Sequence, residues 1–242
     1  MAKVSVIGPA AGAGKRYGAK ANKIFERLNG QPVFIRTLEL FTGRDDVCQV
    51  QMVVSAEDLD MVKESFGGAL GFMGVGIVVG GPTRAHSVRN ALARVTAEAD
   101  LVCVHDAVRP CLSQVWVSAV FDAAAKYGAA MLANPLHGTL KRVSAQGEIE
   151  ETVPRDGLWE AQTPQVFSRS LLQKAYEGDL SNVTDDAQLV EALGQKVHVV
   201  PGDPRNIKIT SPADLAVVAA VIDSLPKPKL AGGDHPFAEA KW

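Results

Sequence analysis

Short apolar runs rich in β-branched residues alternate along the chain with longer segments in which apolar residues recur at helical spacing. A short, continuous apolar run is typical of a strand that is buried on both faces of a sheet. We predict six such strands, at residues 4–7, 50–54, 76–79, 101–105, 129–133 and 197–200.

Three helices are predicted between these strands. The first begins at Pro32, because proline is favoured in the first turn of a helix. The apolar positions that define the helices are Phe34, Leu38 and Phe41 in the first, Val88, Ala91, Leu92 and Val95 in the second, and Val115, Val120 and Ala124 in the third. Alternating strands and helices predict an α/β fold with a mostly parallel, doubly wound sheet. Ligands of such a sheet bind beyond the carboxyl ends of its strands.

Residues 135–162 break this alternation. Two polar segments, 139–143 and 149–153, flank a turn at Gln146-Gly147 and predict a protruding two-stranded arm. A hairpin of this size is marginally stable alone, so we expect a second copy of the chain to cover it in a homodimer. We predict one domain over residues 1–224, followed by a loosely ordered tail, 225–242, rich in proline, glycine and charged residues.

Composition narrows the class of protein. The 242-residue chain can bury a large core, and 47% of its residues are hydrophobic. It has no long apolar run of membrane-spanning length and no signal peptide at its start, which predicts a cytoplasmic protein without membrane contact. Three cysteines without Cys-x-x-Cys spacing, Cys48, Cys103 and Cys111, predict free thiols. The net charge of −2, with no basic stripe, argues against nucleic acid as a partner.

The first predicted strand leads into a loop of small residues that ends in two cations, Gly-Pro-Ala-Ala-Gly-Ala-Gly-Lys-Arg over residues 8–16. Without large side chains, backbone N–H groups can approach a phosphate closely. Lys20 and Lys23 add positive charge beside the loop. Pro9 excludes a P-loop and Tyr17 excludes the dinucleotide fingerprint, because each motif needs glycine there. The alternative is a tight turn without a ligand, next to a solvated basic segment.

Two further strands end in residues suited to ligand binding. Gly81 and Ser87 follow the third strand, where Thr83 could equally cap the next helix. Asp106 and Arg109 follow the fourth strand. The aspartate could bind a substrate hydroxyl or a phosphate-bound Mg²⁺, and the arginine could bind a phosphate. Alternatively, the two form a salt bridge. We interpret the histidine before Asp106 as structural.

Three later groups of polar residues have plain structural interpretations. Lys141 and Arg142 could form the solvated surface of the arm. Thr184 could cap a helix over the two aspartates that follow it. Lys208 could protect a strand edge against aggregation.

Together, these motifs closely resemble those of the 2-C-methyl-D-erythritol 4-phosphate cytidylyltransferase family over roughly residues 4–222. Each motif is modest by itself, but all of them occur in the family's order and at its spacing. They are Pro9-Ala10-Ala11-Gly12-x-Gly14-x-Arg16, Lys23, Gly80-Gly81-x-x-Arg84-x-x-Ser87, His105-Asp106-Ala107-x-Arg109-Pro110, Thr139-x-Lys141-Arg142, Pro154-Arg155-x-x-Leu158-Trp159, Gln162-Thr163-Pro164-Gln165 and Asn206-Ile207-Lys208-Ile209-Thr210.

The resemblance implies a Rossmann-like nucleotidyltransferase fold, a homodimer joined through the arm, and Mg²⁺ as cofactor. It also implies transfer of CMP from CTP to 2-C-methyl-D-erythritol 4-phosphate in the non-mevalonate route to isoprenoids. The products are pyrophosphate and 4-diphosphocytidyl-2-C-methyl-D-erythritol.

The resemblance also implies a role for each matching residue. Arg16 and Lys23 are the catalytic residues, which stabilise charge at the α-phosphate. The loop that cradles CTP comprises Ala10, Ala11, Gly12, Ala13, Gly14 and Lys15, with Gly81 and Ser87 at the base and sugar. The polyol phosphate contacts Asp106, Arg109, Thr163 and Lys208, together with Thr139 and Arg155 from the partner's arm. Asp106 is also the candidate ligand of Mg²⁺, which the CTP phosphates mainly hold.

Four positions depart from the family's pattern. Asn22 replaces a common proline, and Gly138, Pro82 and Arg205 stand where acidic residues are expected. Two alternatives therefore stay open. One is a cytidylyltransferase for ribitol 5-phosphate or a similar polyol phosphate, and the other is a non-catalytic nucleotide-binding protein. A Rossmann dehydrogenase is disfavoured, because Tyr17 breaks its fingerprint.

Overall fold

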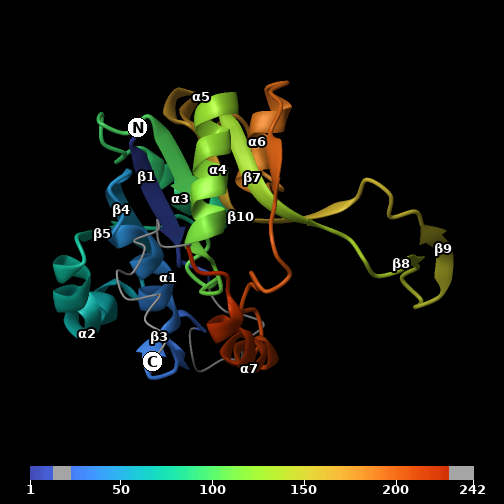
Figure 1. The fold of residues 1–242 in the computed structure, drawn as a ribbon, viewed down its shortest axis with the longest axis horizontal. Helices are drawn as coiled ribbons and strands as arrows, with labels where there is room; N and C mark the ends of the chain where they lie inside the picture. The colour runs from blue at the N-terminus through green and yellow to red at the C-terminus, as the bar shows by residue number, and fades with distance from the viewer. Residues whose placement is uncertain (13–22, 229–242) are drawn as a thin grey trace, which may run out of the picture.

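The computed structural model describes residues 1–12 and 23–228. Its centre is a seven-stranded sheet with the order β11-β7-β10-β6-β1-β4-β5 (Figure 1). All neighbours pair in parallel except β10, which runs antiparallel to β6 and β7. The strands are β1 (Val4–Pro9), β4 (Val47–Val54), β5 (Val75–Val79), β6 (Leu101–Val104), β7 (Ala129–Pro135), β10 (Trp159–Ser168) and β11 (His198–Pro201).

All six predicted strands are confirmed, with ends that differ by a few residues. Within this sheet, sequence reasoning missed β10, which lies between β6 and β7. Residues 159–162, predicted as the end of the arm, are the start of this strand. The polar run Gln162-Thr163-Pro164-Gln165 concealed it, because proline and buried amides argue against a central strand. The β10–β7 register shifts between Ala161 and Gln165, which accommodates this run.

The three predicted helices are confirmed as α1 (Val33–Thr42), α3 (Arg84–Leu92) and α4 (Gln114–Tyr127). Pro32 is the N-cap of α1 rather than its first residue. Val95, predicted on the second helix, lies beyond the end of α3 but packs against the core. Val115 lies on α4 as predicted, where it is exposed. A helix near Thr184, one of the interpretations above, is present as α6 (Asp186–Ala192). Helices that were not predicted are α2 (Leu59–Phe72), α5 (Arg169–Ala175), α7 (Pro212–Val221) and the 3-10 turns η1 (Lys23–Phe25) and η2 (Ile222–Ser224).

Helices cover both faces of the sheet, so the doubly wound architecture is confirmed (Figure 1). Alternate residues of a strand point to opposite faces, and β1 shows this directly. Val6 belongs to the core that contains Phe34 of α1 and Val120 of α4. Ile7 belongs to the other core, which contains Val88 of α3 and buried residues of α5 and α6. The loops at the strand ends are therefore held between two packed layers.

The predicted arm is confirmed as β8 (Leu140–Val143) and β9 (Ile149–Val153), an antiparallel pair that projects away from the sheet (Figure 1). Gly147 has a φ of +86°, which suits the turn between them. Two short antiparallel strands, β2 (Arg27–Leu28) and β3 (Gln31–Pro32), precede α1. Of the predicted tail, residues 229–242 lie outside the described residues. Before them, the carbonyl of Pro226 accepts a hydrogen bond from the Ser113 hydroxyl.

All three cysteines are free thiols, as predicted. Among residues 1–12 and 23–228, no helix has the length and apolar character needed to cross a membrane.

Candidate active site

The loops after β1 and β5 lie in contact at one edge of the sheet. The backbone N–H of Ala10 donates to the Val53 carbonyl at 2.8 Å, and that of Gly80 donates to the Val54 carbonyl at 2.7 Å. A Cβ added to Gly80 would lie 2.8 Å from the Cβ of Ala11, so only glycine fits there. The two loops predicted to bind a nucleotide are thus adjacent in space.

Only part of the predicted phosphate-binding loop can be placed. Ala10, Ala11 and Gly12 are described, whereas Ala13, Gly14, Lys15 and Arg16 lie outside the described residues. Lys23 is the first residue of η1.

Gly81 and Ser87 form a closed turn at the start of α3. The Ser87 hydroxyl accepts from the Gly81 N–H at 3.1 Å and donates to the Thr83 carbonyl at 2.9 Å. The Thr83 side chain accepts from the His86 N–H, so the prediction that Thr83 caps this helix is confirmed. A role for Gly81 and Ser87 in binding a base or sugar stays a prediction.

Asp106 follows β6 and is surrounded by three cations. Its Oδ2 lies 2.7 Å from Nζ of Lys208 and 3.7 Å from Nε of Arg109, while its Oδ1 lies 3.2 Å from Nε of Arg84. Burial alone would raise the pKa of Asp106, but Arg84, Lys208 and Arg109 outweigh it and hold that pKa far below its usual range. The predicted pairing with Arg109 is confirmed, although it is the longest of the three contacts.

His105 and Thr163 form a hydrogen-bonded chain that ends at the backbone of Asp106. Oγ1 of Thr163, on β10, accepts from the Asp106 N–H at 3.2 Å and lies 3.0 Å from Nδ1 of His105. Nε2 of His105 lies 3.0 Å from the Arg109 carbonyl. Because a carbonyl only accepts, Nε2 carries the proton, and Nδ1 accepts from the threonine hydroxyl. His105 is buried and neutral, which confirms the structural interpretation.

The free energy of unfolding is expected to fall by about 3 kcal/mol between pH 6.5 and pH 4 because of His105. Burial lowers its pKa in the folded protein from 6.5 to about 4. In this window only the unfolded chain takes up the proton, so stability that is complete above pH 6.5 is lost as the pH falls. Urea unfolding across this range measures the loss.

The control is His105→Gln, whose amide N–H suits the Arg109 carbonyl but does not titrate. The variant should lose about 3 kcal/mol less than the wild type over the same range. An equal loss in both proteins would contradict the prediction.

The segment after β11 completes the cluster. Nη1 of Arg109 donates to the Asn206 carbonyl at 2.7 Å, and Nδ2 of Asn206 donates to the Thr163 carbonyl at 2.9 Å. Lys208 lies outside any strand and pairs with Asp106, so its interpretation as a strand-edge residue was wrong. Four predicted substrate residues, Asp106, Arg109, Thr163 and Lys208, are therefore brought together from three distant segments.

Three residues of this neighbourhood were not recognised from the sequence as members of the cluster. Arg84 pairs with both Asp106 and Asp186. Asp186 also accepts a hydrogen bond from the Tyr176 hydroxyl. Arg84 occurs in the glycine-containing motif after β5, which was a usable signal. Asp186 was interpreted only as part of a helix cap, and the cap itself was misplaced. Asp185, not Thr184, is the N-cap of α6.

Thr139 and Arg155 are not part of this cluster within one chain. Both are exposed at the arm, and Arg155 donates to the His137 carbonyl. The arm leads away from the sheet edge (Figure 1). On the arm itself, Arg142 pairs with Glu151 at 2.7 Å between exposed side chains, so the interpretation of this segment as solvated surface is confirmed.

Comparison with known proteins identifies the family. The family model for 2-C-methyl-D-erythritol 4-phosphate cytidylyltransferase matches residues 4–224. The chain belongs to this family. The member from Rhodopirellula baltica is 41% identical over 92% of this chain and 96% of its own length, and that from Dechloromonas aromatica is 42% identical over 92% and 98%. The crystal structure of the Thermus thermophilus cytidylyltransferase superposes with a TM-score of 0.75 at 32% identity, covering 91% of this chain and 99% of that one.

The residues of this family member do not form a resident metal site in the part of the chain that the structure describes. No group of three or more His, Cys, Asp or Glu side chains is suitably placed there. Both oxygens of Asp106, the predicted metal ligand, already face cations. A carboxylate with three cationic neighbours is a poor site for a further cation.

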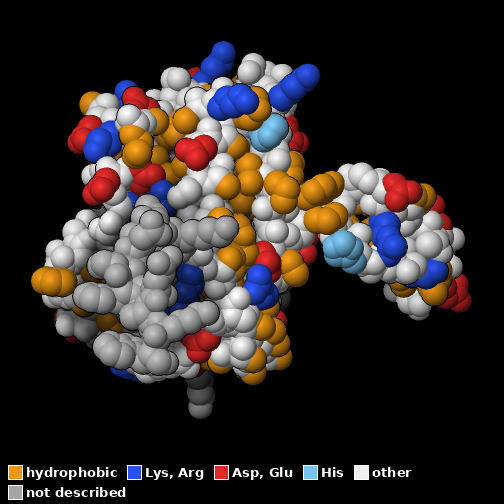
Figure 2. Space-filling view, in the orientation of Figure 1, with side chains coloured by type: hydrophobic (Ala, Val, Ile, Leu, Met, Phe, Trp, Pro, Cys, Tyr) orange, Lys and Arg blue, Asp and Glu red, His pale blue; other side chains and the backbone are white. Residues whose placement is uncertain are grey.

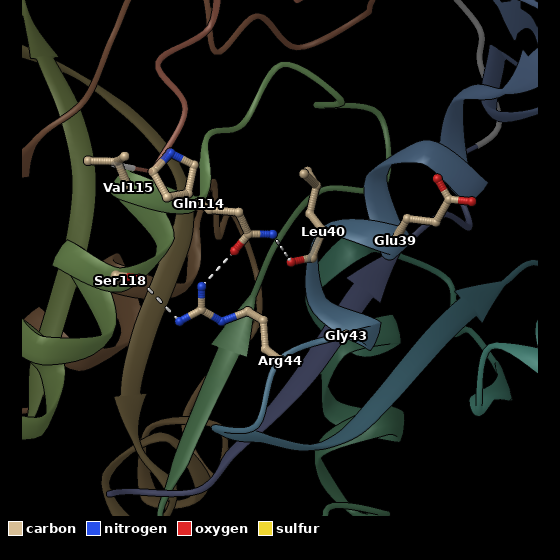
Figure 3. Close-up of a pocket in the computed structure, with 8 residues that line it drawn as sticks. Glu39, Leu40, Gly43, Arg44, Gln114, Val115 and Ser118 are labelled. Carbon is tan, nitrogen blue, oxygen red and sulfur yellow. Dashed lines mark hydrogen bonds between the residues drawn. The ribbon is translucent and has the colours of Figure 1, made fainter. Parts of the chain in front are cut away.

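A separate cavity of about 370 Å³ lies between the end of α1 and the start of α4 (Figure 3). Arg44 points into it and donates to Gln114 and Ser118. Its guanidinium also pairs with Asp46 at 2.6 Å. None of the lining residues belongs to the Asp106 cluster, and the arginine's charge is already satisfied. The cytidylyltransferase cluster at the strand ends is therefore the candidate active site.

Proposed function

We infer that this chain transfers CMP from CTP to 2-C-methyl-D-erythritol 4-phosphate, which yields 4-diphosphocytidyl-2-C-methyl-D-erythritol and pyrophosphate in the non-mevalonate route to isoprenoids. The observation that carries this inference is the joining of Asp106, Arg109, Thr163 and Lys208 at the sheet edge, in a chain that matches the family over residues 4–224. That match also supports one catalytic domain over residues 1–224. We further propose a cytoplasmic location, supported by three free cysteines.

The reaction requires no general base. The attacking group is the phosphate of the polyol, whose second ionisation lies near pH 6, so it is largely a dianion at neutral pH. His105 is buried and both of its ring nitrogens are engaged, so it takes no proton from the substrate. The task of the protein is to bring two anions into line and to neutralise the charge that develops on the α-phosphoryl oxygens and on pyrophosphate.

Each predicted residue has a proposed part in that task. Lys208 is the most exposed cation of the cluster, with 35% of its side chain accessible, so it is available to the polyol's phosphate together with Arg109. Asp106 and Thr163 suit the polyol's hydroxyl groups. Ala10–Lys15, Gly81 and Ser87 bind CTP, and Arg16 and Lys23 stabilise charge at the α-phosphate.

Mg²⁺ enters this proposal as part of the nucleotide substrate. Magnesium keeps several waters and binds readily to substrate phosphates, so it arrives as the metal complex of CTP. The complex reduces the negative charge of the triphosphate. The cationic side chains of the protein supply the remaining charge neutralisation.

We propose a homodimer in which the arm of one copy reaches the active site of the other. The arm's predicted substrate residues, Thr139 and Arg155, are exposed. Figure 2 shows hydrophobic side chains gathered where the arm leaves the body, and there Leu158 and Trp159 are 39% and 44% exposed. Large apolar side chains at the base of a protruding hairpin favour burial against a second copy.

The proposed function predicts pyrophosphate release when purified protein receives Mg²⁺, CTP and 2-C-methyl-D-erythritol 4-phosphate. ATP, GTP and UTP replace CTP as nucleotide controls, and ribitol 5-phosphate replaces the second substrate. Release should be fastest with CTP and methylerythritol phosphate. Preference for ribitol 5-phosphate would reassign the substrate while keeping the mechanism, and no release with any pair would favour a non-catalytic nucleotide-binding protein.

A further inference from the structure

Arg84 lies between two carboxylates, Asp106 after β6 and Asp186 at the start of α6. Its Nη2 lies 2.8 Å from Oδ2 of Asp186, and its Nε lies 3.2 Å from Oδ1 of Asp106. The side chain of Asp186 is fully buried, and its other oxygen accepts from the Tyr176 hydroxyl. Burial alone would lower the pKa of Arg84, but Asp186 and Asp106 outweigh it and raise that pKa above its usual range. Arg84 is thus permanently charged.

Asp186 is itself fixed by the strand that carries Thr163. The backbone N–H groups of Asp186 and Ala187 both donate to Oε1 of Gln165, at 3.0 and 2.9 Å. Nε2 of Gln165 donates to Asp185 at 2.9 Å. The start of α6 is therefore attached to β10 through Gln165. This residue lies two positions after Thr163, which binds the Asp106 backbone.

This arrangement divides the oxygens of Asp106 between different cations. Arg84 contacts Oδ1, while Lys208 contacts Oδ2. A guanidinium prefers to bind a carboxylate with two parallel hydrogen bonds. Asp186 occupies one nitrogen of Arg84 and so restricts its contact with Asp106 to Nε. Oδ2 consequently stays available to Lys208.

We propose that Asp186, supported by Tyr176, is a positioning residue that acts through Arg84 to orient Asp106 and to keep Lys208 in place for the phosphate of the polyol substrate. This inference rests on the proposed function for its kinetic consequence. Without the charge of Asp186, Arg84 turns toward Asp106, binds both of its oxygens and displaces Lys208.

The test is Asp186→Asn, which keeps the shape of the side chain and an oxygen for the Tyr176 hydroxyl. We expect the KM for methylerythritol phosphate to rise about tenfold, the effect of one weakened charge-assisted hydrogen bond, with the KM for CTP changed less than about twofold. If Asp186 acts through Arg84, then Asp186→Asn adds no further change to the KM of an Arg84→Gln variant.

Asp46→Asn is the matched control, because it removes the carboxylate from another arginine pair, Arg44–Asp46, outside the cluster. It should leave both KM values unchanged. Urea unfolding of each variant separates this effect from a general loss of stability. Equal changes in both KM values after Asp186→Asn, or the same change with and without Arg84, would overturn the proposal.

A second readout does not depend on enzymatic activity. A lysine whose Nζ is hydrogen-bonded to a carboxylate, as Lys208 is to Asp106, is shielded from an amine reagent. The labelling rate of Lys208, measured by mass spectrometry of the folded protein, should rise several-fold in Asp186→Asn and return to the wild-type rate in the double variant with Arg84→Gln. An unchanged rate in Asp186→Asn would overturn the positioning role even if the proposed function failed in the assay.

Discussion

The Lys23→Ala variant is expected to have a turnover number lowered by about a hundredfold or more, the usual cost of removing one donor that stabilises charge in the transition state. Lys23 is the first residue of η1 and follows the small-residue loop 8–16, the proposed site of the CTP phosphates. In this reaction no proton transfer is required, so charge neutralisation carries most of the catalysis. The measurement is steady-state pyrophosphate release with both substrates saturating.

The structure shows how the residues directly after Lys23 are anchored. The next residue, Ile24, is buried. Phe25 stacks on Phe66 at 5.8 Å and packs against the edge of Phe34 at 5.9 Å between ring centroids. These contacts anchor Ile24 and Phe25 of η1 to the core. An anchored backbone next to the proposed donor reduces the reorganisation needed in the transition state.

The control for Lys23→Ala is Lys126→Ala. Lys126 lies near the end of α4, just before β7 begins. It is therefore at the amino ends of the parallel strands, whereas the cluster lies at their carboxyl ends. It should retain wild-type turnover and stability. Wild-type turnover in Lys23→Ala would remove this lysine from the mechanism.

Arg155→Ala is expected to raise the KM for methylerythritol phosphate by about tenfold to a hundredfold, the effect of a lost charge-assisted phosphate contact. The KM for CTP should change less than about twofold, because the arm is proposed to reach only the second substrate. Arg142→Ala on the same arm is the matched control, since Arg142 already pairs with Glu151. Equal effects of Arg155→Ala on both KM values would refute its assignment to the polyol phosphate.

Mixing Arg155→Ala with Lys23→Ala tests whether the arm acts on the partner's site. In a mixed dimer, one active site contains Lys23 from the Arg155→Ala chain and Arg155 from the arm of the Lys23→Ala chain. At low methylerythritol phosphate, random exchange should restore about one quarter of the wild-type activity, because about half of the dimers are mixed and each has one complete site. No gain on mixing, in protein shown to have exchanged subunits, would place the arm's function within its own chain.

The sequence predicted the parts of the fold whose signals are local. A strand buried on both faces needs a continuous apolar run, and six strands could be recognised on that basis. The arm was predicted because polar segments on either side of a glycine turn form a hairpin without help from the rest of the chain. The strand β10 lacked such a signal, because Gln162, Thr163 and Gln165 make it polar. Their partners lie on other elements.

For the candidate site too, the sequence predicted some of the residues and the structure added others. Motif order by itself indicated the family, and the resemblance to that family pointed to Asp106, Arg109, Thr163 and Lys208. Only the tertiary structure decided that Arg84 joins Asp106 to Asp186, a residue 102 positions away. Buried charges are tolerated only when opposite charges and hydrogen-bond partners surround them. Folding supplies the contact between Arg84 and Asp186, which periodicity and motif spacing do not predict.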